Sequence, residues 1–343
     1  MATPAPRSTP TRRQCLRAGL ALGLGAALLS PPAQRLAAAA EDFIRGPAVP
    51  DHPLLRLSPR VAMVFAADGF PTPENRGMMA NVVFVITSVG VVVLDSGASV
   101  QIGEMAIRRL RTLTDRPVVA IVNSHAHGDH FLGNDAFVQS FGDGLPIHAH
   151  PEARRQIAGI AGSGWRAAME RWTNGASMGT RVVVPNRDAA PGDLLRFGDT
   201  TLRIHHHGRA HTEADLCVEV VEDRVLYAGD VVMNGRIANM DDGSYVGTLK
   251  TIDALVRDLP DALWVPGHGR ASRTLPAEQR AFFAGLYEPC LAAVKAGEDE
   301  AAARRRVLAD PRVAPHAGRI QGWDGNIGKY ISIAYLEAEK EAF

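Results

Sequence analysis

Short apolar runs rich in β-branched residues recur along the chain and predict β-strands. The run at residues 118–122 is apolar throughout, which predicts a strand that is buried on both faces. In the first half of the chain the predicted strands are 61–66, 82–87, 91–95 and 118–122, and in the second half they are 201–205, 216–221 and 225–228.

Longer segments carry apolar residues at helical spacing. Ile107, Leu110 and Leu113 recur at intervals of three and predict a helix over 102–113. Residues 41–60 contain several prolines and are typical of an extended lead-in. The further predicted helices are 151–175, 247–259, 277–295 and a terminal helix at 326–340.

Strands and helices therefore occur in two sets, near 61–138 and near 192–259. Each set can supply one sheet that buries one face against the other sheet and one face under helices. This predicts an α/β fold of four layers, with two sheets packed together between outer helices (αββα). No internal repeat or low-complexity linker divides the chain after residue 41.

The first forty residues are typical of an export signal. Arg12 and Arg13 precede an apolar run at 18–29, and small residues at 37–40 follow. This order matches a secretory signal peptide, and the adjacent arginines indicate the twin-arginine route, with an ordinary Sec signal as the alternative. We expect cleavage after residue 40, a mature domain at 41–343 with a C-terminal helical extension, a periplasmic location and no stable membrane anchor.

Charge and composition exclude several classes of protein. The formal net charge is zero, but residues 1–40 hold five arginines and no acid, so residues 41–343 carry a net charge of −5. The chain has no excess of basic residues that would indicate a nucleic-acid partner. We therefore expect a small-molecule substrate. Three cysteines are too few for a disulfide scaffold, and whether Cys217 and Cys290 pair is left open.

Candidate chemistry is concentrated in the segment Asn123-Ser124-His125-Ala126-His127-Gly128-Asp129-His130. Three imidazoles and a carboxylate directly after a buried strand would be costly without a compensating cation. His125 and His127 can face one side of an extended segment. The flexibility of Gly128 would let the chain turn Asp129 and His130 toward a neighbouring position.

Three further candidates each follow a predicted strand, where loops gather functional groups. His211 stands in Gly-Arg-Ala-His-Thr, Asp230 closes Leu-Tyr-Ala-Gly-Asp, and His268 stands in Val-Pro-Gly-His-Gly. Imidazole and carboxylate ligands suit Zn²⁺, with iron or manganese as alternatives.

The full set closely resembles the metallo-β-lactamase superfamily over roughly residues 55–300. The resemblance implies two Zn²⁺ ions and a bridging hydroxide that cleaves an ester, thioester, lactone or lactam, with Asp129 both binding metal and orienting the hydroxide. It assigns His125, His127 and His211 to one metal, Asp129, His130 and His268 to the other, and Asp230 to both.

Asp230 stands where the well-known β-lactamases of this superfamily mostly have Cys or Ser. Asp68 to Gly77, together with the export signal, resembles the SoxH-type periplasmic hydrolases, which are associated with sulfur oxidation and quinoprotein dehydrogenases. Alternatives are a mononuclear iron enzyme that oxidises persulfides, a β-lactamase proper, or a non-catalytic metal-binding accessory protein.

Other residues are candidates for supporting roles. Phe70, Asn234 and Arg236 are candidate substrate contacts, and no lysine lies in 231–240 to act as a carboxylate clamp. Asp95 ends a predicted strand and is a candidate for ordering the ligands through hydrogen bonds, or for a simple turn cap. Trp165 and Trp172 either wall a pocket or pack in the core. Oligomeric state is left open.

Overall fold

The computed structural model describes residues 44–342, so the predicted export signal lies outside the described residues. Gly46 to Phe343 form one compact unit, and the account below concerns that unit. No helix in the described residues is long and apolar enough to cross a membrane.

The first sheet has seven strands in the order β1-β2-β3-β4-β5-β6-β7. Strands β1 to β4 pair antiparallel, whereas β4 to β7 pair parallel. The strands are β1 (Leu54–Arg56), β2 (Val61–Val64), β3 (Val82–Thr87), β4 (Gly90–Leu94), β5 (Val118–Val122), β6 (Ile147–Ala149) and β7 (Arg187–Asp188).

The second sheet has five strands in the order β12-β11-β10-β9-β8. Its strands pair antiparallel except for β11 and β12, which are parallel. They are β8 (Leu194–Phe197), β9 (Thr200–His205), β10 (Cys217–Val220), β11 (Val225–Gly229) and β12 (Leu263–Pro266).

Alternating side chains place the two sheets face to face. Val83 and Val85 of β3 belong to a buried cluster that they share with Val218 of β10, between the sheets. Val82 and Phe84 point the other way and pack with the helices over the first sheet. The period-two alternation of each strand therefore builds both the central core and an outer one.

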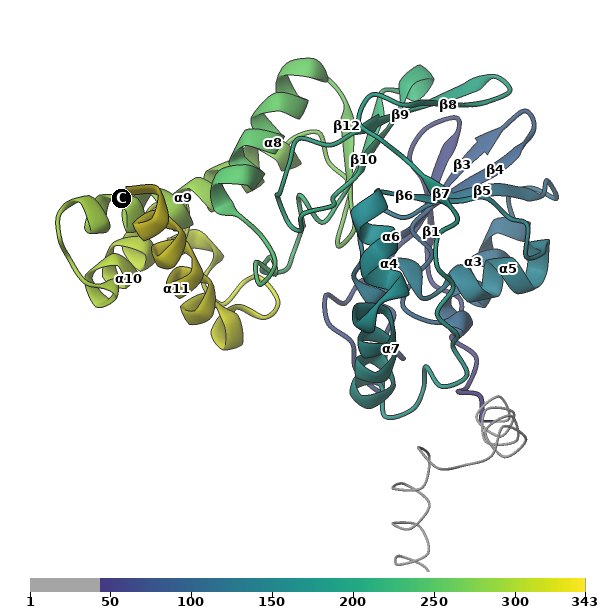
Figure 1. The fold of residues 1–343 in the computed structure, drawn as a ribbon, viewed down its shortest axis with the longest axis horizontal. Helices are drawn as coiled ribbons and strands as arrows, with labels where there is room; N and C mark the ends of the chain where they lie inside the picture. Colours follow the sequence, from purple (N-terminus) through teal and green to yellow (C-terminus); the bar gives the residue numbers. More distant parts are fainter. Residues whose placement is uncertain (1–43, 343) are drawn as a thin grey trace, which may run out of the picture. The chain divides into compact units, whose positions relative to one another are not determined.

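Helices cover both outer faces (Figure 1). Helices α3 to α7 accompany the first sheet, and α8 to α11 the second, where α9, α10 and α11 pack on one another. The helices are α3 (Val100–Arg111), α4 (Gly128–Phe131), α5 (Asn134–Phe141), α6 (Pro151–Ala158), α7 (Ile160–Trp172), α8 (Tyr245–Asp258), α9 (Leu275–Lys295), α10 (Glu300–Ala309) and α11 (Trp323–Ala342), with short 3₁₀ turns η1 (Val221–Asp223) and η2 (Ala314–His316). The four-layer prediction is confirmed.

Some predicted elements differ in detail. The single helix predicted over 151–175 is two helices, α6 and α7, because Gly159 between them has an extended backbone. Helix α10 was not predicted, since it buries only Ala303 and Val307 and carries little apolar periodicity.

Parallel pairing brings the chain segments of interest to common edges. Leu94 of β4 lies opposite Val122 of β5, so Asp95 and the segment that begins at Asn123 leave the sheet together. In the same way β11 and β12 end side by side, and Asp230 follows the first while His268 follows the second. The two sheets thus present four candidate segments at one edge of the sandwich.

Candidate metal centre

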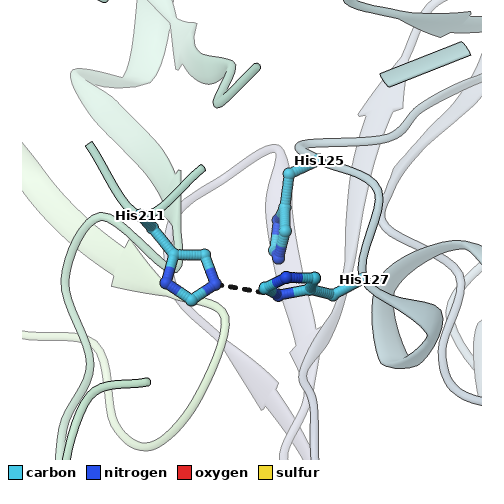
Figure 2. A group of neighbouring side chains, drawn as sticks. All are labelled: His125, His127 and His211. Carbon is cyan, nitrogen blue, oxygen red and sulfur yellow. Dashed lines mark hydrogen bonds between the residues drawn. The ribbon is translucent and has the colours of Figure 1, made fainter. Parts of the chain in front are cut away.

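Three imidazoles converge at this edge from two chain segments (Figure 2). The ligand atoms of His125, His127 and His211 lie within 4.8 Å of one another, and Nδ1 of His127 is 3.0 Å from Nε2 of His211. Each opposite nitrogen is engaged elsewhere. His125 Nδ1 contacts Ser124 Oγ at 2.9 Å, His127 Nε2 contacts Asp242 Oδ2 at 3.1 Å, and His211 Nδ1 donates to the backbone oxygen of Asn239 at 2.9 Å.

A second group consists of Asp129, His130 and His268. Nδ1 of His268 donates to the backbone oxygen of Met79 at 2.7 Å, which leaves Nε2 of that ring as the free lone pair. Nε2 of His268 lies 3.2 Å and Nε2 of His130 lies 3.4 Å from Oδ2 of Asp129. Both rings therefore present the same atom to the same carboxylate.

Asp230 lies between the two groups. Its Oδ1 is 3.4 Å from Nε2 of His130, whereas its Oδ2 is 3.2 Å from Nε2 of His268 and 3.6 Å from Nε2 of His211. A carboxylate with oxygens directed at both groups is placed to bridge two cations.

Asp95 supports this arrangement through hydrogen bonds, one of them to the nitrogen of His130 opposite its candidate ligand atom. Its Oδ2 accepts hydrogen bonds from His130 Nδ1 at 2.7 Å, from Ser124 Oγ at 2.6 Å and from Tyr227 Oη at 2.6 Å. Its Oδ1 accepts from the backbone N–H of Ser124 at 2.7 Å. Asp95 is fully buried with φ of +54°, a strained conformation that these four bonds offset. Asp95 also forms a group with His125 and His130 that could hold a metal ion, but hydrogen bonds already occupy both of its oxygens, which favours a role in orienting the candidate ligands.

The two groups differ in charge. Burial, and then the neighbouring imidazoles, lower the pKa of His125 well below its usual value, and burial lowers the pKa of His211 to about 3. Burial alone would also lower the pKa of His130, but Asp230, Asp129 and Asp95 raise it well above its usual value. Burial thus favours neutral rings with free lone pairs at His125 and His211, whereas the carboxylates around His130 favour its protonated form.

The donor set fits a pair of metal ions. His125 Nε2, His130 Nε2 and Asp230 Oδ1 are buried atoms without a hydrogen-bond partner among the described residues. Such atoms are costly unless they are satisfied by a partner that is absent from the protein chain. Imidazole nitrogens and carboxylate oxygens at these positions are the ligands that zinc takes in proteins.

Two glycines make room for the centre. A Cβ atom on Gly267 would lie 2.1 Å from Oδ1 of Asp230 and 2.8 Å from Cε1 of His130, so a side chain there would displace both ligands. The sequence suggested that Gly128 acts through its flexibility, but the structure gives it a different role. It begins the helical turn α4, and its missing side chain leaves space for Trp165, whose Cβ would lie 2.8 Å from the added atom.

A cavity of ≈ 350 Å³, here called the main cavity, opens over the two groups. One wall is apolar and consists of Phe70, Pro71, Met79, Trp165 and Trp172. Polar side chains also line the cavity, and these are Arg236, Asn239, Asp241, Asn326, Lys329 and Tyr330.

The predicted substrate contacts lie in two neighbouring cavities. Phe70 and Arg236 line the main cavity, and Arg236 also lines, together with Asn234, a neighbouring cavity of ≈ 220 Å³, here called the side cavity. Lys329 and Tyr330 of α11 were not anticipated. Lys329 comes from a helix distant in sequence from the lining residues of other segments, so no local pattern could reveal its place in the cavity.

The remaining histidines and cysteines lie apart from the centre. His205 contacts Glu219 at 3.1 Å, and His206 donates to the backbone oxygen of Asp215 at 2.9 Å, so neither replaces His211. Neither His148 nor His150 lines the main cavity. Cys217 and Cys290 are both free and buried, so they do not form the disulfide that the sequence left open.

A family model of the metallo-beta-lactamase superfamily matches residues 75–268, which is more than half of the chain. The chain therefore belongs to the metallo-beta-lactamase superfamily, as its fold and its clustered histidines and aspartates indicate.

Among curated proteins, the chain is 29% identical over 201 residues to an uncharacterized protein of Aquifex aeolicus, covering 57% of this chain and 85% of that one. It is 27% identical over 222 residues to the acyl-coenzyme A thioesterase MBLAC2 of Bos taurus, covering 56% of this chain and 74% of the relative. It is 26% identical over 154 residues to the hydroxyacylglutathione hydrolase of Polaromonas sp., covering 44% of this chain and 48% of that enzyme.

Among solved structures, a metallo-beta-lactamase from Pontibacter korlensis superimposes with a TM-score of 0.54 at 19% identity. The match covers 67% of this chain and 98% of the other. At this identity the likeness concerns the fold alone.

Proposed function

We propose that this protein is a dinuclear zinc hydrolase that cleaves an ester, thioester or lactone bond. The observation that carries the proposal is the pairing of the ligand atoms. In both groups the imidazole nitrogens that face the centre are free or contact only other ligands, while the opposite nitrogens are held by other residues.

Bound zinc lowers the pKa of water toward about 7 and polarises a carbonyl oxygen, which supplies nucleophile and electrophile together. The chain's own residues provide the rest. Asp129 lies at the floor of the main cavity, where its carboxylate can orient the attacking water as well as bind metal. Asp95 holds the ring of His130, and the backbone of Met79 holds that of His268.

Two observations favour ester and thioester substrates over lactams. The thioesterase and the hydroxyacylglutathione hydrolase among the relatives are both named for cleaving acyl groups from thiols or related carriers. Asp230 occupies the position at which the lactam-cleaving members mostly carry Cys or Ser. Lactam cleavage remains one arm of the test below.

We further propose that the enzyme acts in the periplasm after twin-arginine export and is related in role to the SoxH-type hydrolases. The supporting features are the paired arginines Arg12 and Arg13 before an apolar run and the segment Asp68–Gly77. Fusion of residues 1–40 to a reporter that is active only when it is exported folded tests the route, with Arg12→Lys/Arg13→Lys as the variant that should abolish export.

The test of the catalytic proposal compares His127→Ala with His205→Ala. The first removes a proposed ligand, whereas the second removes a half-buried histidine that does not line the main cavity. Metal content and turnover are measured on a panel of thioesters, esters, lactones, lactams, sulfate esters and phosphodiesters, with a chelator control.

We expect wild type and His205→Ala to bind two equivalents of zinc and to cleave at least one acyl substrate. His127→Ala should lose metal and about a thousandfold or more in turnover, because metal polarisation supplies several kcal/mol of transition-state stabilisation. Full activity in the chelated protein would refute the proposal. One iron per chain with oxygen uptake on a persulfide would favour the dioxygenase alternative, and tight zinc binding without any turnover would favour the accessory protein.

A further inference from the structure

Arg236 is a buried cation beside the candidate metal centre. It is 8% exposed and lines the main cavity together with Asp129, Asp230 and His268. Its contacts are with backbone oxygens and two rings, and none is an ion pair with a carboxylate of residues 44–342. A charge that is removed from water in this way is costly unless a ligand compensates it.

The guanidinium is fixed in place by its neighbours. Nε donates to the backbone oxygen of Ile237 at 3.2 Å, and Nη1 donates to the backbone oxygen of Gly69. Nη1 also lies 3.4 Å from Nδ1 and 3.5 Å from Nε2 of His268. The Cζ atom stands 4.3 Å from the ring centre of Phe70. Nη2 is the one nitrogen left without a partner in the described part of the chain.

The other charges near the cavity are already paired. Nζ of Lys329 lies 2.5 Å from Oδ1 of Asp241. Asp242 lies outside the main cavity, and its Oδ2 contacts Nε2 of His127. Asp129 and Asp230 are the carboxylates that act on Arg236 through space, and both belong to the proposed ligand set. A bound metal pair would take up the charge of these two carboxylates, which would leave Arg236 without a carboxylate that compensates it.

Another part of the lining of the main cavity is apolar. Trp165 and Trp172 of α7 have ring centres 6.1 Å apart, and Trp172 is 41% exposed although it is a large apolar side chain. Phe70, Pro71 and Met79 continue this surface toward the metal centre. Apolar surface of this kind at a cavity wall is the usual counterpart of an alkyl or aryl group of a ligand.

We propose that the substrate is amphipathic, with an anionic group that binds Nη2 of Arg236 close to the scissile bond and an apolar group that packs on Trp165 and Trp172. This inference rests on the proposed function, because it concerns the substrate of the same centre. Since Nε and Nη1 are occupied, the contact uses a single nitrogen and accepts a carboxylate or a sulfonate alike, without the two-pronged geometry of a free guanidinium.

The first experiment uses two thioesters that differ in one charge, S-benzoyl thioglycolate and its neutral amide S-benzoyl thioglycolamide. Hydrolysis of either adds water across the same carbon–sulfur bond and releases benzoate and a thiol. In zinc-loaded wild type we expect kcat/KM to favour the anionic thioester by about tenfold to hundredfold, which corresponds to one charge-assisted hydrogen bond.

Arg236→Gln should bring this preference close to one, mainly through a higher KM for the anionic thioester. Because the preference compares two substrates on one variant, a general loss of activity cancels. Arg236→Lys keeps the charge and should retain part of the preference, so it serves as the second variant if the glutamine variant does not fold.

The second experiment measures binding of benzenesulfonate by calorimetry, since this aryl anion is a poor zinc ligand. Binding should weaken about tenfold or more in Arg236→Gln and stay unchanged in Arg270→Gln. Arg270 is the matched control: it also lies over an aromatic ring, with its Cζ 4.7 Å from the ring centre of Phe65, but it lines only the side cavity.

Equal kcat/KM for the two thioesters in wild type, or the same preference in Arg236→Gln, would overturn the inference while leaving the hydrolase proposal intact. Loss of benzenesulfonate binding in Arg270→Gln would overturn it as well, because the anion would then occupy the side cavity. If wild type cleaves neither thioester, benzenesulfonate binding still decides the role of Arg236 independently of turnover.

Discussion

The floor and the walls of the main cavity are built in different ways. The floor consists of five of the seven ligand candidates, which are nearly fully buried: His127, Asp129, His211, Asp230 and His268. Each of the three histidine rings is held by a second contact on the side away from the centre. The walls contain side chains that are half exposed, such as Trp172 and Lys329, and they come from loops and from α7 and α11.

This difference indicates that the floor of the main cavity serves the reaction, whereas the walls serve substrate recognition. A floor held by hydrogen bonds between buried groups has one arrangement, which suits a reaction that needs fixed ligands. Walls that belong to loops and outer helices can change without disturbing the floor. Alterations to the floor should therefore act on metal binding, and alterations to the walls should act on substrate preference.

Among changes outside the proposed ligand set, the largest effect is expected from Asp95→Asn. Asparagine tolerates the positive φ of this position, but its amide nitrogen cannot accept the hydrogen bonds of His130 Nδ1, Ser124 Oγ and Tyr227 Oη. Zinc affinity should fall about tenfold to hundredfold, as is usual when a residue that orients a metal ligand is lost. Competition with a chromophoric chelator measures this.

Tyr227→Phe is the matched control, because it removes one donor and leaves the carboxylate in place. Its effect on zinc affinity should be smaller. Wild-type affinity in Asp95→Asn would show that the ligands hold their positions without this residue.

An intermediate effect is expected from Gly322→Ala, which acts on a wall of the main cavity through Phe70. An added Cβ would lie 2.4 Å from Cζ of Phe70, so the phenyl ring must move from its place beside Arg236. Unfolding free energy should fall by about 1–2 kcal/mol from the positive φ and by about 1–3 kcal/mol more from the collision. Urea denaturation and kcat/KM are the measurements.

Gly318→Ala separates these two causes. Gly318 also has a positive φ, of 67°, but has open space around its Cβ position. Gly318→Ala should lose only the unfolding free energy that comes from the positive φ, and its turnover should not change. An equal loss of turnover in both variants would mean that Phe70 does not contribute to the cavity.

The smallest effect is expected from Trp172→Ala. About half of this side chain already faces solvent, so its loss should cost about 1 kcal/mol of binding, or roughly fivefold in kcat/KM, for a substrate with an aryl or alkyl group. Zinc content should not change. Val184→Ala removes another exposed apolar side chain, one outside the main cavity, and should leave kcat/KM unchanged.

Much of the fold could be predicted because its signals are local. The apolar run at 118–122 and the strands 82–87 and 225–228 have a period of two or are buried on both faces, and all three are strands in the structure. The break between α6 and α7 escaped prediction because the helical spacing of apolar residues continues across Gly159. Whether a glycine interrupts such a helix depends on how the residues around it pack. Among site residues, Gly267 escaped notice because its role depends on two atoms that are distant in sequence.

The amino-acid sequence by itself determined the class of chemistry. The residue types and spacing from His125 to His130, with His211, Asp230 and His268 after later strands, predict a metal site without any tertiary information. Tertiary structure decided what reaches the cavity over them. Parallel pairing of β4 with β5 and of β11 with β12 brings the candidate ligands to one edge, and the packing of α11 brings Lys329 and Tyr330 into the lining of the main cavity. Such contacts depend on how distant surfaces bury one another, and no local pattern carries that information.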